Sequence, residues 1–375
     1  MSKINKFSEK IINWRASYGR RGLPWQGQTD PYRVWLSEIM LQQTQVSTVV
    51  DRYQRFLQRF PTVLDLATAQ EEAVMSEWAG MGYYTRARNL WACAKLVVEK
   101  HGGSFPRSAR ELETLPGIGR STSAAIAAFC YQERTPILDG NVKRVLARWQ
   151  GIELPINQSA TDKILWDLAE KTLPKSKELM PSYTQGIMDF GATVCTPKRA
   201  VCQTQENSSQ RGCVLARECV AYQAGKVAEI PFKIPKKTSP LMTSDMLLIF
   251  AEGSVLLEKR PSKGIWGGLW TFPETIWRLQ TDVSESAPND LTHFGALASY
   301  AQDTHWQKAM EVARPLGVVK HIFTHRTLFF KPRVLRFKTK MQVSEKNLRW
   351  FDFDDLKDIG MPKPVEDILA SFSSN

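Results

Sequence analysis

The stretch Leu115–Trp149, LPGIGRSTSAAIAAFCYQERTPILDGNVKRVLARW, decides the fold. Its opening Leu-Pro-Gly-Ile-Gly turn precedes a run of small residues from Ser121 to Phe129, and this pattern predicts a hairpin that leads into a helix. Gly117 and Gly119 let the backbone turn tightly with free N–H groups at the helix start, an arrangement that favours a phosphate. Asp139 then follows an apolar pair and precedes a second, basic helix. An Asp at such a position is most often an N-cap.

Composition indicates an intracellular protein that binds a polyanion. The chain has 375 residues, a hydrophobic fraction of 43%, a net charge of +12 and a pI of about 9.4. This length suits two domains, and the positive charge favours nucleic acid as a partner. No run approaches the roughly 18 apolar residues of a membrane span, and the N-terminus does not read as a signal peptide. We therefore expect a cytoplasmic protein without membrane contact, whose six cysteines are thiols or metal ligands.

Several further motifs stand in one order along the chain. They are Leu23-Pro24-Trp25, DPYRVWLSEIMLQQTQV from Asp30 to Val46, GMGYYTRARNL from Gly80 to Leu90, the hairpin, Leu138-Asp139-Gly140-Asn141-Val142, and four late cysteines. Together they resemble the helix-hairpin-helix DNA glycosylase superfamily and, within it, the MutY-like adenine DNA glycosylases, over nearly the whole chain. The resemblance implies a monomeric base-excision repair enzyme that flips a nucleotide out of duplex DNA. It would then hydrolyse the N-glycosidic bond of adenine mispaired with 8-oxoguanine or guanine.

Two carboxylates carry the predicted chemistry. Glu38 lies among apolar neighbours in a predicted helix that Pro31 opens and that runs to about Gln45. If Glu38 is buried against a cleft, its pKa rises and it becomes a general acid near neutral pH. The resemblance implies that Glu38 protonates the adenine ring, and that Asp139 stabilises the sugar cation or bonds to it, with assistance from Asn141. Two carboxylates with separate roles are typical of glycoside hydrolysis.

Ser121 bears on whether the DNA strand is also cut. In the glycosylases that cut it, a lysine just after the hairpin attacks the sugar as a Schiff-base nucleophile. A serine has no amine, so the resemblance implies a monofunctional enzyme here.

The resemblance also implies a set of DNA contacts. A glutamine of the segment Gln42, Gln43 and Thr44 would enter the duplex beside the unusual base, with Tyr83 as a second wedge, because an extruded nucleotide leaves a hole in the stack. Taken alone, these residues are equally typical of polar surface and core aromatics. Trp25 and Gln185 are expected in the base pocket. The remaining expected DNA-binding positions are Arg86, Arg88, Gly117, Gly119, Ser121 and Lys143.

Four clustered thiols predict a metal or cluster site. Cys195, Cys202, Cys213 and Cys219 are separated by six, ten and five residues. The resembled family carries a [4Fe–4S] cluster on gaps of six, two and five, so the loop between the two middle cysteines is eight residues longer here. Because the outer gaps match, we expect a retained [4Fe–4S] cluster. Zinc on the same four cysteines is the alternative, and unligated thiols are the remaining one.

Beyond a proline- and lysine-rich linker the pattern becomes that of strands. Residues 246–257 predict a hairpin around Glu252-Gly253, and the segment from Gly264 to Pro273 resembles the Nudix-like C-terminal domain of the same family. No Arg-Glu-x-x-Glu-Glu run follows, so nucleotide hydrolysis is not expected and the domain is predicted to read DNA. Phe323, Thr324 and His325 match the loop that senses 8-oxoguanine in the family, with Thr324 replacing the usual serine.

The sequence therefore predicts a multidomain protein of α and α+β class. Residues 1–225 would form an all-α helix-hairpin-helix glycosylase domain with the cysteine cluster loop at about 195–219. Residues 226–240 would be a linker, and 241–375 a Nudix-like α+β domain for lesion recognition. Three other functions remain open. An oxidised-pyrimidine glycosylase/lyase is disfavoured by Ser121 and the C-terminal domain, a non-catalytic lesion-binding protein by the presence of both Glu38 and Asp139, and a Nudix pyrophosphatase by the missing metal-binding run.

Overall fold

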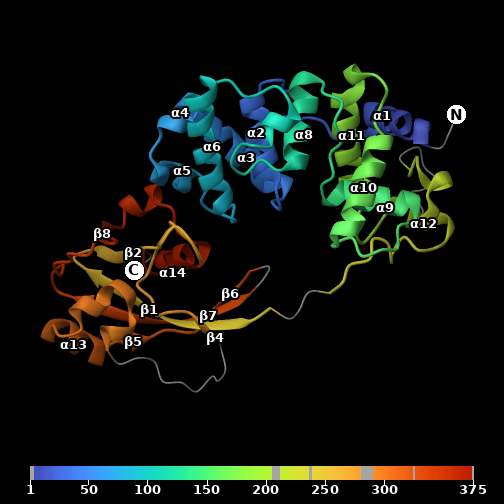
Figure 1. The fold of residues 1–375 in the computed structure, drawn as a ribbon. Coiled ribbons are helices and arrows are strands. Elements are labelled where there is room, and N and C mark those ends of the chain that lie inside the picture. The colour runs from blue at the N-terminus through green and yellow to red at the C-terminus, as the bar shows by residue number, and fades with distance from the viewer. Residues whose placement is uncertain (1–3, 205–211, 236–238, 280–289, 324–325, 374–375) are drawn as a thin grey trace. The chain divides into compact units, whose positions relative to one another are not determined.

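The computed structural model describes residues 4–204, 212–235, 239–279, 290–323 and 326–373. Two units make up the chain (Figure 1): Met1–Thr68 with Asn89–Pro235, and Ala69–Arg88 with Lys236–Asn375. The predicted combination of a helical domain and an α+β domain is confirmed. Of the helices in the described ranges, none has the length and apolar character needed to cross a membrane.

The described residues of the first unit form helices and the loops that connect them. The α-helices are α1 (Phe7–Tyr18), α2 (Pro31–Leu41), α3 (Val46–Arg59), α4 (Val63–Thr68), α6 (Thr85–His101, whose first residues belong to the second unit), α7 (Ala109–Leu112), α8 (Arg120–Tyr131), α9 (Gly140–Gln150), α10 (Ser159–Lys171), α11 (Met180–Thr193) and α12 (Val220–Gln223). Helix α2 begins where sequence predicts, because the Asp30 side chain accepts the Tyr32 N–H at 2.9 Å and Pro31 occupies the first turn. The expected continuation to Gln45 is wrong. Gln43 adopts a φ of 56°, which no α-helix can continue.

The hairpin forms between α7 and α8 as predicted. Gly117 has a φ of 76° there, and a Cβ on it would lie 2.7 Å from Cβ of Asn89. Both facts require glycine. Gly119 is the N-cap of α8 and caps it with no side chain, so the first N–H groups of α8 keep their capacity to bind a ligand. Helix α8 packs on α2 and α7, while α11 packs on α1, α8 and α9 (Figure 1).

Pairs of aromatic side chains pack α1 against α9 and α11. Phe7 of α1 packs on Trp149 of α9 with ring centroids 4.5 Å apart, and Trp14 meets Phe190 of α11 edge-on at 5.1 Å. All four rings are buried. Such ring pairs contribute roughly 0.5–1.5 kcal/mol each beyond the area that they bury, so α1, α9 and α11 form one rigid core.

The second unit is an eight-stranded mixed sheet with helices. Its elements are β1 (Leu241–Ala251), β2 (Ser254–Lys259), β3 (Trp270–Thr271), β4 (Arg278–Leu279), β5 (Arg314–Pro315), β6 (Val319–Ile322), β7 (Thr327–Phe337), β8 (Leu348–Asp352), α5 (Glu71–Glu77), α13 (Thr304–Glu311) and α14 (Lys363–Ser373). The strand order is β3-β2-β1-β7-β5, with β4 on β1, β6 on β7 and β8 on β2. Strands β1 and β7 pair in parallel. The predicted hairpin is confirmed: Ala251 pairs with Ser254, and Glu252 and Gly253 have φ values of 47° and 72°, as a type I′ turn requires.

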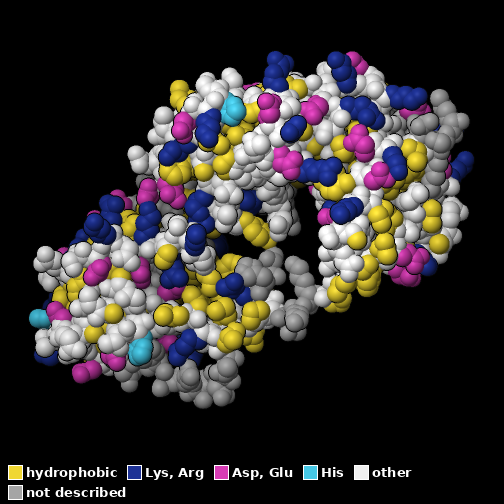
Figure 2. Space-filling model, in the orientation of Figure 1, with side chains coloured by type: hydrophobic (Ala, Val, Ile, Leu, Met, Phe, Trp, Pro, Cys, Tyr) yellow, Lys and Arg dark blue, Asp and Glu magenta, His cyan; other side chains and the backbone are white. Residues whose placement is uncertain are grey.

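The segment Ala69–Arg88 belongs to the second unit although it lies inside residues 1–225. Within that unit Lys259 forms an ion pair with Glu72, and the Tyr84 hydroxyl donates to the Met361 carbonyl at 3.2 Å. Figure 2 shows Lys and Arg side chains spread over the visible face of both units, interleaved with Asp and Glu. The net charge of +12 is thus distributed rather than confined to one tail.

Candidate active site

A cleft of about 1080 Å³ in the first unit gathers side chains from α2, α8, α9 and α11. It brings together all the residues that the sequence placed in the catalytic site and base pocket, with four of the predicted DNA-binding residues. These are Trp25, Glu38, Gln42, Gln43, Thr44, Ser121, Asp139, Asn141 and Gln185. Segments separated by more than a hundred residues thus converge on one cavity of a size that suits a nucleobase and its sugar.

Glu38 is the acid of this cleft. It stands on α2 between buried neighbours and is itself half-buried. Burial, and then the negative charge of Asp139, raise the pKa of the Glu38 carboxyl from its ordinary value of 4.5 to about 8. At neutral pH the group therefore holds a proton that it can donate.

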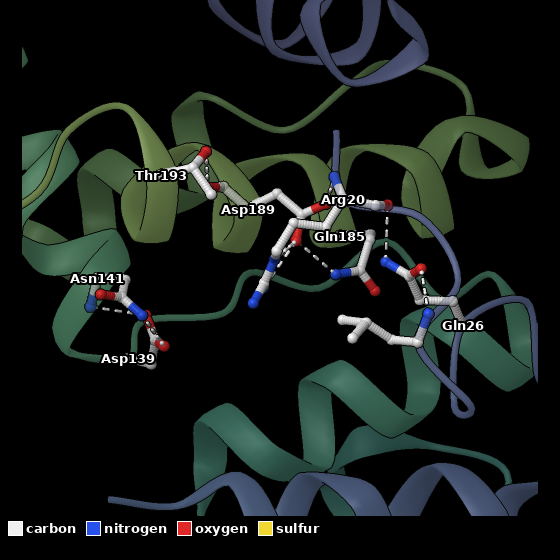
Figure 3. Close-up of polar contacts among 8 residues, drawn as sticks. Arg20, Gln26, Asp139, Asn141, Gln185, Asp189 and Thr193 are labelled. Carbon is white, nitrogen blue, oxygen red and sulfur yellow. Dashed lines mark hydrogen bonds and ion pairs between the residues drawn. The ribbon is translucent and has the colours of Figure 1, made fainter. Parts of the chain in front are cut away.

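Asp139 is both an N-cap and a cleft residue. Its Oδ1 accepts the backbone N–H groups of Asn141 at 3.0 Å and Val142 at 2.8 Å, which caps α9. Among the described residues its Oδ2 receives one long contact, 3.5 Å, from Nδ2 of Asn141 (Figure 3). One carboxylate oxygen is thus fixed by the helix end while the other keeps lone pairs for a cation or water in the cleft.

Arg144, one turn after Asn141 on α9, fixes the Asn141 side chain by a hydrogen bond. Its side chain is buried with 7% of its surface exposed. Nη2 donates to Oδ1 of Asn141 at 2.8 Å and to the Gly191 carbonyl at 2.6 Å, while Nε donates to the Cys195 carbonyl at 2.7 Å. Charge-assisted bonds of this kind are strong, so Arg144 ties the amide that faces Asp139 to the start of the cysteine region.

Ser121 and Gln42 form hydrogen bonds that fix the backbone segments next to Asp139 and Glu38. The Ser121 Oγ accepts the N–H of Leu138 at 3.0 Å, which fixes the backbone next to Asp139. The Gln42 side chain, at the end of α2, donates to Oγ1 of Thr122 on α8 at 3.3 Å. Ser121 therefore has a structural role, besides lacking the amine that a lysine would bring to this position.

The other predicted DNA-contact residues do not line the cleft. Lys143 makes an ion pair with Asp162 at 2.5 Å. Tyr83, Arg86 and Arg88 belong to the second unit. There Tyr83 is 42% exposed, with a left-handed φ of 51°.

Arg86 and Arg88 both donate to carbonyls inside the second unit. The Arg86 guanidinium bonds the Met81 and Gly82 carbonyls at 3.1 and 3.2 Å, and burial lowers its pKa to about 10. Arg88 donates to the carbonyl of Gly267. Arg86 therefore shapes the glycine-rich turn that presents Tyr83, whereas Arg88 connects the start of α6 to the segment around Gly267.

The four cysteines line one small cavity of about 20 Å³, between α9, α11 and α12. Arg148, only 3% exposed, donates to Sγ of Cys195 at 3.5 Å and to the Thr196 carbonyl at 2.7 Å. A hydrogen bond between Cys202 and Cys213 lowers the pKa of the Cys202 thiol and raises that of Cys213.

Four thiols that line one cavity beside a cation are the donor type that an iron–sulfur cluster takes. Within the described residues, no three His, Cys, Asp or Glu are grouped so as to hold a single metal ion. Residues 205–211 of the long loop lie outside the described part of the chain.

The predicted lesion-recognition loop is described only in part. Thr324 and His325 lie outside the described residues. Phe323, half-buried, packs edge-on against His321 with ring centroids 4.7 Å apart and against Trp266 at 6.2 Å. The aromatic cluster therefore holds the first residue of the loop.

Comparison with known proteins agrees with this architecture. The model of the HhH-GPD superfamily of base excision DNA repair proteins matches residues 36–171, and that of the NUDIX domain matches 245–371. The adenine DNA glycosylase of Buchnera aphidicola subsp. Schizaphis graminum is 34% identical over 376 residues, which cover 98% of this chain and 99% of that protein. The chain belongs to the adenine DNA glycosylase family. The human adenine DNA glycosylase is 32% identical over 88% of this chain and 67% of its own length. Among solved structures, a thermostable thymine-DNA glycosylase aligns with a TM-score of 0.52 and 27% identity, over 59% of this chain and 98% of that one.

Two features of this adenine DNA glycosylase family member could not be predicted from the sequence: the role of Arg144 and the Arg20–Asp189 ion pair. Arg144 reads as one more basic residue of an amphipathic helix, and its bonds to Asn141 and Cys195 could not be inferred from spacing. Asp189 and Arg20 form an ion pair at 2.7 Å between positions 169 residues apart. The available sign is that Asp189 is the one charged residue of α11, because a buried acid needs a partner.

Proposed function

We propose that this chain removes adenine mispaired with 8-oxoguanine or guanine from duplex DNA by hydrolysing its N-glycosidic bond. The observation that carries the proposal is the pair of carboxylates, Glu38 and Asp139, in one cleft where the pKa of Glu38 stands at about 8. The names of the relatives support adenine as the base. Because a duplex hides the bond, the nucleotide would be flipped into the cleft.

Glu38 begins the reaction as the general acid. Its proton passes to a ring nitrogen of adenine, so the electron pair of the C1′–N9 bond leaves with a neutral base. Positive charge then develops on the sugar. General acid catalysis of this kind contributes about 10²–10⁴-fold, and a carboxyl with a pKa near the working pH suits it.

Asp139 faces that developing charge. Its Oδ1 is engaged by the start of α9, so Oδ2 is the oxygen available to stabilise the cation or to bond to C1′. Water then adds to C1′, and the proton that water releases balances the one that Glu38 gave. Asn141, held by Arg144, keeps Oδ2 oriented.

The reaction would stop at the abasic site. Strand cleavage by the Schiff-base route needs an amine at the sugar, and Ser121 supplies a hydroxyl that already accepts the Leu138 N–H. We therefore propose a monofunctional glycosylase.

DNA contacts would come from both units. Gln42, Gln43 and Thr44 stand at the cleft as candidates to fill the gap left by the flipped nucleotide. Tyr83 is an exposed ring suited to a second wedge. The free N–H groups at the start of α8, after Gly119, suit a phosphate. We propose that the loop that begins at Phe323 reads 8-oxoguanine.

Cys195, Cys202, Cys213 and Cys219 would hold a [4Fe–4S] cluster, which would supply metal–thiolate bonds that link the segments on which the four cysteines lie. The cationic Arg148 at Sγ of Cys195 favours thiolate there. Zinc on the same residues is the alternative, and metal analysis separates the two.

Two isosteric variants test the chemistry. Glu38→Gln and Asp139→Asn should each lose at least about 10²-fold in single-turnover adenine release while binding the duplex normally, because the amides keep the shape of the cleft. Near-normal excision by either variant would remove that residue from the mechanism. Loss of binding together with loss of excision would mean that the substitution disturbed the fold instead.

A further inference from the structure

The ion pair between Arg20 and Asp189 lies next to the Gln185 side chain (Figure 3). Asp189, fully buried on α11, receives Nε and Nη2 of Arg20 on Oδ1 at 2.8 and 2.7 Å. The backbone N–H of Arg20 donates to Oδ2 at 3.2 Å, and the Gln26 side chain donates to the Arg20 carbonyl at 2.9 Å. Arg20 is therefore fixed at its main chain and at its guanidinium, and it can pin the carboxylate of Asp189 in one place.

This carboxylate decides how the Gln185 amide is turned. Nε2 of Gln185 donates to Oδ1 of Asp189 at 3.0 Å. A carboxylate that is paired with a guanidinium only accepts hydrogen bonds, so Gln185 must turn its N–H₂ group towards Asp189. Its Oε1 then points away from Asp189 (Figure 3). Gln185 lines the cleft beside Trp25 and Arg20 and is 8% exposed, so an acceptor and not a donor is presented there.

From this geometry we propose that Arg20 and Asp189 are positioning residues that make the cleft select a 6-aminopurine. The inference rests on the proposed function and adds the source of its base specificity. Adenine carries an amino donor at C6, which a fixed acceptor can bind. A 6-oxopurine carries a carbonyl at the same place, and two facing acceptors leave a buried polar group unpaired. With the amide free to turn, Gln185 could satisfy either base and would not discriminate.

The test compares three bases in the same duplex: adenine, hypoxanthine and unsubstituted purine, which has neither group at C6. In Asp189→Asn, the new Nδ2 can donate to Oε1 of Gln185, so the amide can turn its N–H₂ group to the cleft. We expect the adenine-to-purine ratio of single-turnover rates to fall about 10-fold or more, and hypoxanthine to gain relative to purine. Excision of purine itself should change little.

Three further proteins make the result decisive. The double variant Gln185→Glu, Asp189→Asn restores an obligate acceptor and should recover the adenine preference. Thr193→Ala is the matched control, because Thr193 lies on the same helix and bonds the Asp189 main-chain carbonyl, at 2.9 Å, rather than its carboxylate. If Asp189→Asn does not fold, Arg20→Met at the partly exposed end of the pair is assayed instead. Without its Arg20 partner the Asp189 carboxylate is no longer held in one place beside Gln185, so the same fall in the ratio is expected.

The outcomes separate this inference from the proposed function. Absence of adenine release by the unaltered chain would contradict the function itself. Adenine release with an unchanged adenine-to-purine ratio in a folded variant would overturn only the positioning role. An equal loss on all three bases would do the same, since it would mean that the ion pair merely stabilises the fold.

Discussion

Glu38 should destabilise the folded protein as pH rises, and Glu38→Gln should remove that effect. The folded state raises the pKa of Glu38 from 4.5 to about 8. Between these values the folded chain binds a proton that the unfolded chain has lost, so stability falls with increasing pH in this window. A difference of about 3.5 units at about 1.4 kcal/mol per unit gives at most about 5 kcal/mol above pH 8, and about 3 kcal/mol at pH 7.

The measurement is urea unfolding of the two proteins at several pH values from 5 to 9. We expect Glu38→Gln to differ from the unaltered chain by less than about 1 kcal/mol at pH 5 and to become progressively more stable than it up to about pH 8, while it loses base release. Glu99→Gln, an exposed position on α6, controls for the change of charge. Equal pH slopes in the unaltered chain and Glu38→Gln would refute the burial of an ionisable acid in the cleft.

Three other predictions concern the acid, the cysteines and the lesion loop. The single-turnover rate should fall as pH rises through about 8, where Glu38 loses its proton; a rate that stays flat to pH 9 would contradict its role. Purified protein should be brown with about four irons per chain, whereas a colourless folded protein with one zinc would show that the metal differs. The double change Thr324→Ala, His325→Ala should lower the preference for adenine opposite 8-oxoguanine over guanine by roughly 5- to 150-fold, and an unchanged ratio at fixed salt would remove the loop from lesion reading.

Local patterns in the sequence were sufficient for the elements that carry the site. The Pro-Gly hairpin, the start of α2 at Pro31 and the N-cap at Asp139 all depend on residues within one or two turns, and each is confirmed. The strand hairpin at Glu252-Gly253 is confirmed for the same reason, because its turn residues adopt the left-handed conformation that the pairing requires.

What sequence reasoning missed depends on long-range partners. Nothing near Arg20 indicates that it pairs with a carboxylate on α11, and nothing near Arg144 predicts that its guanidinium joins Asn141 to the cysteine region. The predicted end of α2 at about Gln45 is also wrong. A Gln-Gln-Thr run is compatible with a helix, and the left-handed conformation of Gln43 is what ends the helix. In each case tertiary contacts or a single backbone angle decided the outcome.

The most direct test of the central claim is base release by the unaltered chain. Duplexes that hold adenine opposite 8-oxoguanine, guanine or thymine are incubated with the protein, and free adenine and strand breaks are measured in the same samples. We predict free adenine from the first two mispairs, little from the adenine–thymine pair, and an intact strand until alkali is added. No adenine from any duplex that the protein demonstrably binds would contradict the account.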